Sequence, residues 1–125
     1  MIGIAMEQTY RRSVEKMYTG VCSVYVLRPY DDPESGITRT KEVRIQNDLP
    51  CRLSFSNLST AEAIHPVTAR EQKVTLFLAP EKDIPPGSKI VVTQCGGTTE
   101  YTRSGKSAVY SSHQEVPLKL FEGWA

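Results

Sequence analysis

Hydrophobic and polar positions alternate in several short runs along this chain, and the clearest two lie in its middle. Val74, Leu76 and Leu78 alternate with other side chains at the two-residue period of a strand. Residues 90–92 are β-branched and favour a pleated sheet over a helix. The Pro-Pro-Gly sequence at 85–87 separates the two runs, because proline cannot donate a hydrogen bond to a strand ladder. The pattern predicts two core strands joined by a stiff corner.

Further strands are predicted on both sides of this pair. A hairpin is expected around the Asp-Pro-Glu-Ser-Gly turn at 32–36, and Cys51, Leu53 and Phe55 alternate with polar residues as in a half-buried strand. The predicted strands are 21–27, 37–43, 51–56, 98–103, 108–110 and 113–121, and the other predicted turns are 47–50, 95–97 and 104–107. Short strands with regularly spaced turns predict a mainly β fold, a small partly closed β-barrel or sandwich of about six to seven short strands.

The beginning of the chain has a different period. Apolar residues recur there at the spacing of one helix face, and charged residues cover the other sides. That stripe consists of Met6, Tyr10, Val14, Met17 and Tyr18. With Gly20 as a C-cap, residues 1–19 are predicted to form one amphipathic helix. Because so short a helix is marginal in water, it is expected to dock on the body or on another subunit. The chain thus divides into an N-terminal helix or arm, 1–20, and a single β-barrel domain, 21–125.

Residues 57–71 interrupt the alternation. This segment is polar, and neither the strand period nor the helix period persists through it. Loops of this length inside a compact domain are usually functional or disordered. Both interpretations stay open from the residues alone.

Charge and cysteine content narrow the classes of function. Fifteen Lys and Arg against fourteen Asp and Glu give a net charge of +1, so no overall field favours DNA or an acidic membrane, although a local basic patch stays open. The apolar start is too short for a signal peptide or a membrane span, so we expect a protein made in the cytoplasm that is not secreted and has no membrane partner. Cys22, Cys51 and Cys95 are odd in number and widely spaced, which predicts three buried or half-buried thiols.

No residue pattern indicates catalysis. Gly-Lys-Ser at 105–107 suggests a phosphate loop, but the first glycine of that motif falls on Glu100 and no helix is predicted to follow. His65 and His113 belong to no cluster with metal-ligand spacing, and no nucleophile elbow marks a hydrolytic triad. We therefore expect no enzyme activity, no metal and no cofactor.

The tyrosines raise one alternative of another class. On the face of a barrel, aromatic rings can stack the bases of a single-stranded nucleic acid. Near-neutral net charge weakens this hypothesis, and changing Tyr101 or Tyr110 to alanine would test it. The residues concerned are Tyr10, Tyr18, Tyr25, Tyr30, Tyr101 and Tyr110.

Several short segments together carry a resemblance to a known class of proteins. They are Met-Tyr-Thr-Gly at 17–20, the turn at 32–38, Leu-Pro-Cys-Arg-Leu-Ser-Phe at 49–55, Leu-Phe-Leu-Ala-Pro at 76–80, Pro-Gly-Ser-Lys-Ile at 86–90, His-Gln-Glu at 113–115 and the ending at 120–125. From about residue 17 to 125, the chain resembles small virion proteins of tailed bacteriophages and prophage-like elements of Gram-positive bacteria, of the head–tail connector or head-closure class. Residues 1–16 lie outside the resemblance.

The resemblance implies a structural protein of the virion rather than an enzyme. It implies a small β-barrel that assembles with copies of itself as a ring beneath the portal, at the head–tail interface. The partners are then portal or adaptor proteins, tail proteins, and packaged double-stranded DNA that passes through the lumen without sequence specificity. A tail-side adaptor or a tail terminator is the alternative station.

Two sets of residues follow from this implied role. By position, the loop that reaches into the channel corresponds to 57–71 and contributes Asn57, Thr60, Glu62, His65 and Arg70. A ring requires each subunit to offer two different patches. For these patches the amphipathic helix and the aromatic end of the chain supply Tyr10, Val14, Met17, Phe121 and Trp124.

Overall fold

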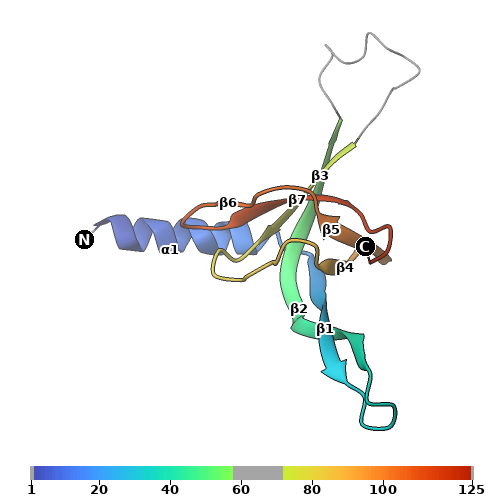
Figure 1. Cartoon of the computed structure of the whole chain (residues 1–125). Coiled ribbons are helices and arrows are strands. Elements are labelled where there is room, and N and C mark those ends of the chain that lie inside the picture. The colour runs from blue at the N-terminus through green and yellow to red at the C-terminus, as the bar shows by residue number, and fades with distance from the viewer. Residues whose placement is uncertain (1, 58–71, 125) are drawn as a thin grey trace.

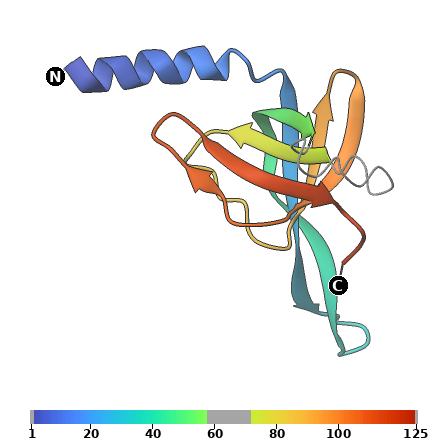
Figure 2. The same ribbon diagram turned by 90° about the horizontal axis from the view of Figure 1, so that it is seen from above.

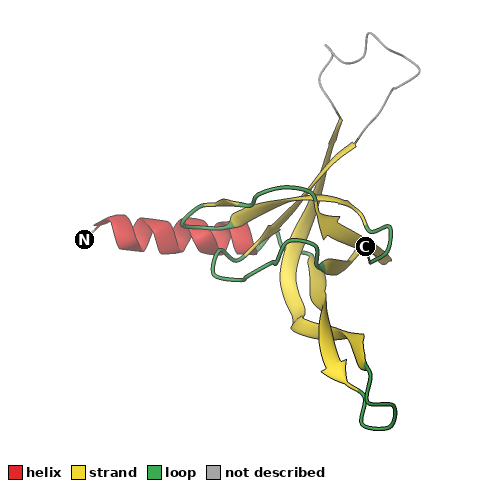
Figure 3. Cartoon of the chain, viewed as in Figure 1, coloured by secondary structure: helices red, strands yellow, loops and turns green. Residues whose placement is uncertain are grey.

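The computed structural model describes residues 2–57 and 72–124, with side chains for 8–56 and 72–124. Within these residues the chain forms one helix, α1 (Ile2–Glu15), and seven strands in a single antiparallel sheet (Figure 3). The strands are β1 (Gly20–Asp31), β2 (Thr38–Asn57), β3 (Gln72–Leu78), β4 (Lys89–Gln94), β5 (Gly97–Arg103), β6 (Ala108–Val109) and β7 (Gln114–Leu120). The predicted mainly β fold with one N-terminal helix is confirmed.

The sheet closes on itself to form a barrel (Figure 2). Its strand order is β3-β2-β1-β4-β5-β7-β6, and an additional pairing of β3 with β7 completes the ring of hydrogen bonds. β7 makes this possible because β3 pairs with one of its sides and two strands share the other. On that second side, β6 pairs with residues 114–115 of β7 and β5 pairs with residues 118–120. Closure removes most free strand edges from the body of the molecule.

The two predicted core strands lie in opposite walls of this barrel. β3 pairs with β2 and β7, whereas β4 pairs with β1 and β5. Leu76 and Leu78 are buried, as their alternation predicted, whereas Val74 is half-buried. Ile90 and Val92 of the β-branched run are buried as well. The corner between the strands also contributes to the core, because Ile84 is only 2% exposed. The whole core consists of Cys22, Val24, Leu49, Cys51, Leu53, Leu76, Leu78, Ile84, Ile90, Val92, Tyr101, Val116 and Leu118.

β1 and β2 are much longer than the short strands predicted. β1 pairs with β4 only over 21–25, and β2 pairs with β3 only over 51–57. Beyond these pairings the two strands continue together as a two-stranded ribbon, residues 26–43, that projects from the barrel (Figure 1). The turn predicted at 47–50 is wrong. The chain passes through it as part of β2, and the register shifts there while Asp48 takes a positive φ of 48°.

The helix is shorter than predicted. It ends at Glu15, and the chain unwinds through tight turns in which the amides of Met17 and Tyr18 donate to the carbonyls of Val14 and Glu15. Gly20 is therefore not the helix cap. It is the first residue of β1, where an added Cβ would lie 3.0 Å from the carbonyl oxygen of Thr93.

The cysteines depart from the prediction in one residue. Cys22 and Cys51 are buried as expected, and their mutual hydrogen bond together with burial raises the pKa of Cys22. Cys95 is exposed instead, because it lies in the two-residue loop between β4 and β5. Val116 and Leu118 of β7 are buried, but Leu120 is exposed at the end of the strand.

Candidate interaction surfaces

A cluster around Lys89 joins the base of the ribbon to the barrel and to the end of the chain. Lys89 Nζ lies 2.6 Å from Glu42 Oε1 and 3.3 Å from Glu100 Oε2. The same ammonium group lies 5.2 Å from the ring centre of Tyr25 and 5.7 Å from that of Phe121. We call this set the lysine cluster: Tyr25, Glu42, Lys89, Glu100, Phe121 and Trp124.

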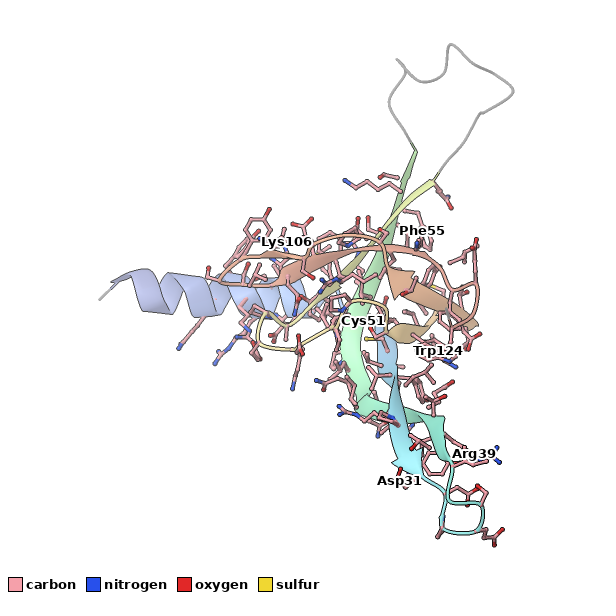
Figure 4. The ribbon with its side chains drawn as sticks, in the orientation of Figure 1. Asp31, Arg39, Cys51, Phe55, Lys106 and Trp124 are labelled. Atoms are coloured by element: carbon pink, nitrogen blue, oxygen red, sulfur yellow. The ribbon has the colours of Figure 1, made fainter. Side chains whose placement is uncertain are left out.

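The end of the chain is held by the lysine cluster. The Phe121 amide donates to the carbonyl oxygen of Glu100 at 3.1 Å, and Trp124 Nε1 donates to Glu42 Oε2 at 3.3 Å. The Phe121 and Trp124 rings meet edge to face with their centres 5.1 Å apart. Both predicted interface aromatics are thus half-buried against their own chain, and Trp124 lies near the base of the ribbon (Figure 4).

Charges in the lysine cluster stabilise one another. The hydrogen bond from Lys89 holds the pKa of Glu42 below its ordinary value, and the one to Glu42 raises the pKa of Lys89. The side chain of Lys89 is only 13% exposed, so its partners replace most of its water. Since Tyr25 and Glu42 belong to β1 and β2, the cluster fixes where the ribbon leaves the barrel.

The far end of the ribbon is also well ordered by hydrogen bonds. Asp32 Oδ1 accepts from the Glu34 amide at 3.0 Å, and Asp32 Oδ2 accepts from the Ser35 hydroxyl at 3.0 Å. The backbone closes the turn, because the Gly36 amide donates to the Asp32 carbonyl oxygen at 2.8 Å. These contacts lower the pKa of Asp32, and the hydrogen bond from the Glu34 amide contributes most. The predicted turn at 32–36 is confirmed.

The helix extends away from the barrel, and its N-terminus lies at the far end (Figures 1 and 2). Of the predicted interface residues, Tyr10 is 59% exposed, Met17 is 50% exposed and Val14 is half-buried. Arg11 ties the helix to the corner between β3 and β4 through Glu81 Oε1, 2.7 Å from its Nη2. The helix is therefore attached near its last turn, while Tyr10 and Met17 stay largely uncovered.

The predicted channel segment begins where β2 and β3 part. Asn57 is the last residue of β2 and lies opposite Gln72, the first residue of β3. Thr60, Glu62, His65 and Arg70 lie outside the described residues. The helix precedes β1, whereas the predicted channel segment connects β2 to β3, so the two are joined to the barrel at different strands.

One arrangement of ionisable side chains was not predicted. The Ser112 hydroxyl lies 2.9 Å from His113 Nδ1, and His113 Nε2 lies 3.1 Å from Glu115 Oε2. These residue types occur in hydrolytic triads. Here the hydroxyl belongs to a residue only 5% exposed, and the imidazole is stacked between the rings of Phe77 and Tyr110. A serine buried to this extent does not present its oxygen to a substrate.

Sequence reasoning missed the lysine cluster because its members come from β1, β2, β4, β5 and the end of the chain. No spacing along the sequence marks such a group. Tyr101, one of the tyrosines considered for base stacking, is buried in the barrel and cannot present its ring at the surface. Among the described residues no three His, Cys, Asp or Glu side chains are placed to hold a metal ion, and no helix is long and apolar enough to cross a membrane.

Comparison with known proteins gives one structural likeness. No family model matches the chain, and no curated protein matches it. The fold is similar to that of the phage-like element PBSX protein xkdH from Bacillus subtilis, at a TM-score of 0.49 and 14% identity, over 82% of this chain and 93% of that chain. A likeness of this degree does not carry a functional assignment.

Proposed function

We propose that this protein is a structural, non-enzymatic component of a tailed bacteriophage or prophage-like particle, a head–tail connector that forms a ring between portal and tail. The observation that carries the proposal is the uncovered helix. A short helix is marginal in water, and here neither Tyr10 on the helix nor Met17 in the turn that follows it is covered by the chain's own barrel. Assembly with other subunits supplies the missing contacts.

The barrel has the properties expected of a ring subunit. Its sheet is closed, so the body is complete within one chain, while the helix and the ribbon extend from it in different directions (Figure 1). A ring needs two different patches on each subunit, and projecting elements on separate sides supply them. The segment patterns at 32–38, 49–55 and 76–80, which resemble those of connector proteins, support the same role.

Electron microscopy with purified portal tests the proposal. We expect an added ring when this protein is mixed with portal, and a monomer or weak rings without it. A variant with Tyr10→Ser and Met17→Ser should fold normally and add no ring, whereas Ile37→Ser, an equally exposed change on the ribbon turn, should assemble like the wild type. Absence of a ring under varied salt would count heavily against the proposal. Copurification with separated tails rather than heads would favour a tail-side adaptor or terminator.

The channel segment gives a second test of the same role. Asn57 and Gln72 form the last pair of the β2–β3 ladder, so deleting residues 61–70 leaves four residues to join them, which is enough for a hairpin loop. We expect an unchanged melting temperature and a loss of packaged DNA from particles that carry the deletion. A large fall in melting temperature would refute the assignment of this segment to DNA retention.

A further inference from the structure

The ribbon has one face on which positive charge is concentrated. In an antiparallel pair, residues directly opposite one another project to the same side, and every second pair shares that side. Register places Val26 opposite Val43, Arg28 opposite Lys41, and Tyr30 opposite Arg39. We call this set the basic face: Val26, Arg28, Tyr30, Arg39, Lys41 and Val43.

The cations of this face are short of negative partners. Arg28, Arg39 and Lys41 are all exposed. Arg39 has a partner in Asp32, at 3.2 Å, and Lys41 lies 5.3 Å from the ring centre of Tyr30. Neither Arg28 nor Lys41 has a salt bridge with any residue that the structure describes. Like charges directly opposite one another destabilise a strand pair, and an anion lying over them removes that cost.

The basic face is held in place before any partner arrives. The lysine cluster fixes the base of the ribbon, and the hydrogen bonds of Asp32 close its turn. Among the acidic residues of this region, Asp32 reaches the basic face and pairs with Arg39, whereas Glu42 lies on the opposite face with Lys89. Asp31 accepts from the Thr38 hydroxyl at 2.9 Å. A preformed site loses little conformational entropy on binding.

We propose that the basic face binds the phosphate backbone of double-stranded DNA without reading its sequence. The Arg28–Lys41 pair and Arg39 lie about 7 Å apart along the ribbon, which suits a continuous line of phosphates. A two-stranded ribbon also fits the width of the major groove. Contacts from cations to phosphates carry no sequence information.

A duplex fits this face better than an acidic protein does. Protein interfaces are built around a buried apolar centre with depleted charge. Here the centre is the Arg28–Lys41 pair, and the aromatic ring of Tyr30 is already engaged by Lys41. The inference rests on the proposed connector role, which already brings packaged DNA into the lumen, and adds a contact surface on β1 and β2 that is separate from the segment 57–71.

Fluorescence anisotropy of a short labelled duplex of mixed sequence, titrated at several salt concentrations, tests this inference. The double variant Arg28→Gln/Lys41→Gln removes two positive charges from the basic face. Arg44→Glu changes the net charge by the same amount next to the base of the ribbon and on the opposite side of the β1–β2 pair, where Arg44 lies opposite Tyr25. We expect the double variant to bind about tenfold or more weakly at low salt, with a salt slope smaller by about two, and Arg44→Glu to stay near wild type.

Three results would overturn the inference. They are no duplex binding by the wild type at low salt, an equal loss in both variants, and equally tight binding of polyglutamate that the double variant also loses. Thermal melting of each variant checks that the barrel is intact. Failure here is separable from failure of the connector role, because the double variant should still add a ring to portal.

Discussion

At the scale of single residues, Lys89 shows how a half-buried cation exchanges most of its water for protein partners. A buried charge is costly unless it is paired, and here two carboxylates and two aromatic rings surround the ammonium group. The arrangement holds Glu42 ionised, because the hydrogen bond from Lys89 lowers its pKa. Stability that depends on a lowered carboxyl pKa is present above its ordinary value and is lost as pH falls through the lowered one.

Acid should therefore open the lysine cluster, and Trp124 reports it. Trp124 is the single tryptophan of the chain and donates to Glu42. We expect its emission to shift to longer wavelength as pH falls, with a midpoint below 4.5, the ordinary value for glutamate. In Glu42→Gln the Trp124 emission should already lie at longer wavelength at neutral pH and should shift less as pH falls. The control Glu34→Gln, on the ribbon turn, should give the same emission titration as the wild type. A wild-type titration in Glu42→Gln would contradict this account.

At the scale of elements, the loop between β4 and β5 is a tight hairpin turn in which one residue has an unfavourable backbone conformation. Cys95 and Gly96 both have positive φ, 53° and 79°. Such a two-residue loop matches the twist of the strands and is most often Asn-Gly. Cysteine has no special tolerance of the left-handed region, so its side chain is strained where asparagine is accepted.

Replacing Cys95 should change stability in a direction set by backbone preference. We expect Cys95→Asn to stabilise the protein by about 0.5–1 kcal/mol and Cys95→Val to destabilise it by a similar amount. Urea denaturation measures both. The two side chains differ little in size at an exposed site, so an equal effect of both variants would show that the backbone conformation is not the cause.

Alternation along the sequence was enough to predict the class of fold and most strand positions, because burial on one face leaves a two-residue period. It failed where tertiary contacts decide. Asn47 to Pro50 has the composition of a turn, yet Asp48 is absorbed into β2 as an irregularity, with its amide donating to the Ser23 hydroxyl oxygen at 3.2 Å. The lysine cluster and the basic face depend on strand register, which no local pattern specifies.

At the scale of the whole molecule, the corner between β3 and β4 completes the barrel core. Ile84 is buried there, and its carbonyl oxygen accepts from Arg103 Nη1 at 2.7 Å. Gln114 of β7 secures the same corner, since its Nε2 donates to the carbonyl oxygen of Ala79 at 2.8 Å. The stiff corner predicted from the two prolines is thus also a packing element.

Removing the Ile84 side chain should test this role. We expect Ile84→Ala to lower the free energy of unfolding by about 2–5 kcal/mol, because it leaves a cavity in a closed barrel. Ile37→Ala is the matched control, since Ile37 is 56% exposed on the ribbon turn and should change stability by about 0.5 kcal/mol or less. Denaturant unfolding of both variants measures the difference. A small effect at Ile84 would mean that the corner is dispensable to the core.

β2 runs as one strand from Thr38, next to the ribbon turn, to Asn57 on the far side of the barrel. It is paired with β1 over its first part and with β3 over its last. The ribbon is therefore connected, through β2 alone, to the point at Asn57 where β2 and β3 separate. We therefore expect a displacement of the ribbon on docking to act on the strand that also borders the β2–β3 separation.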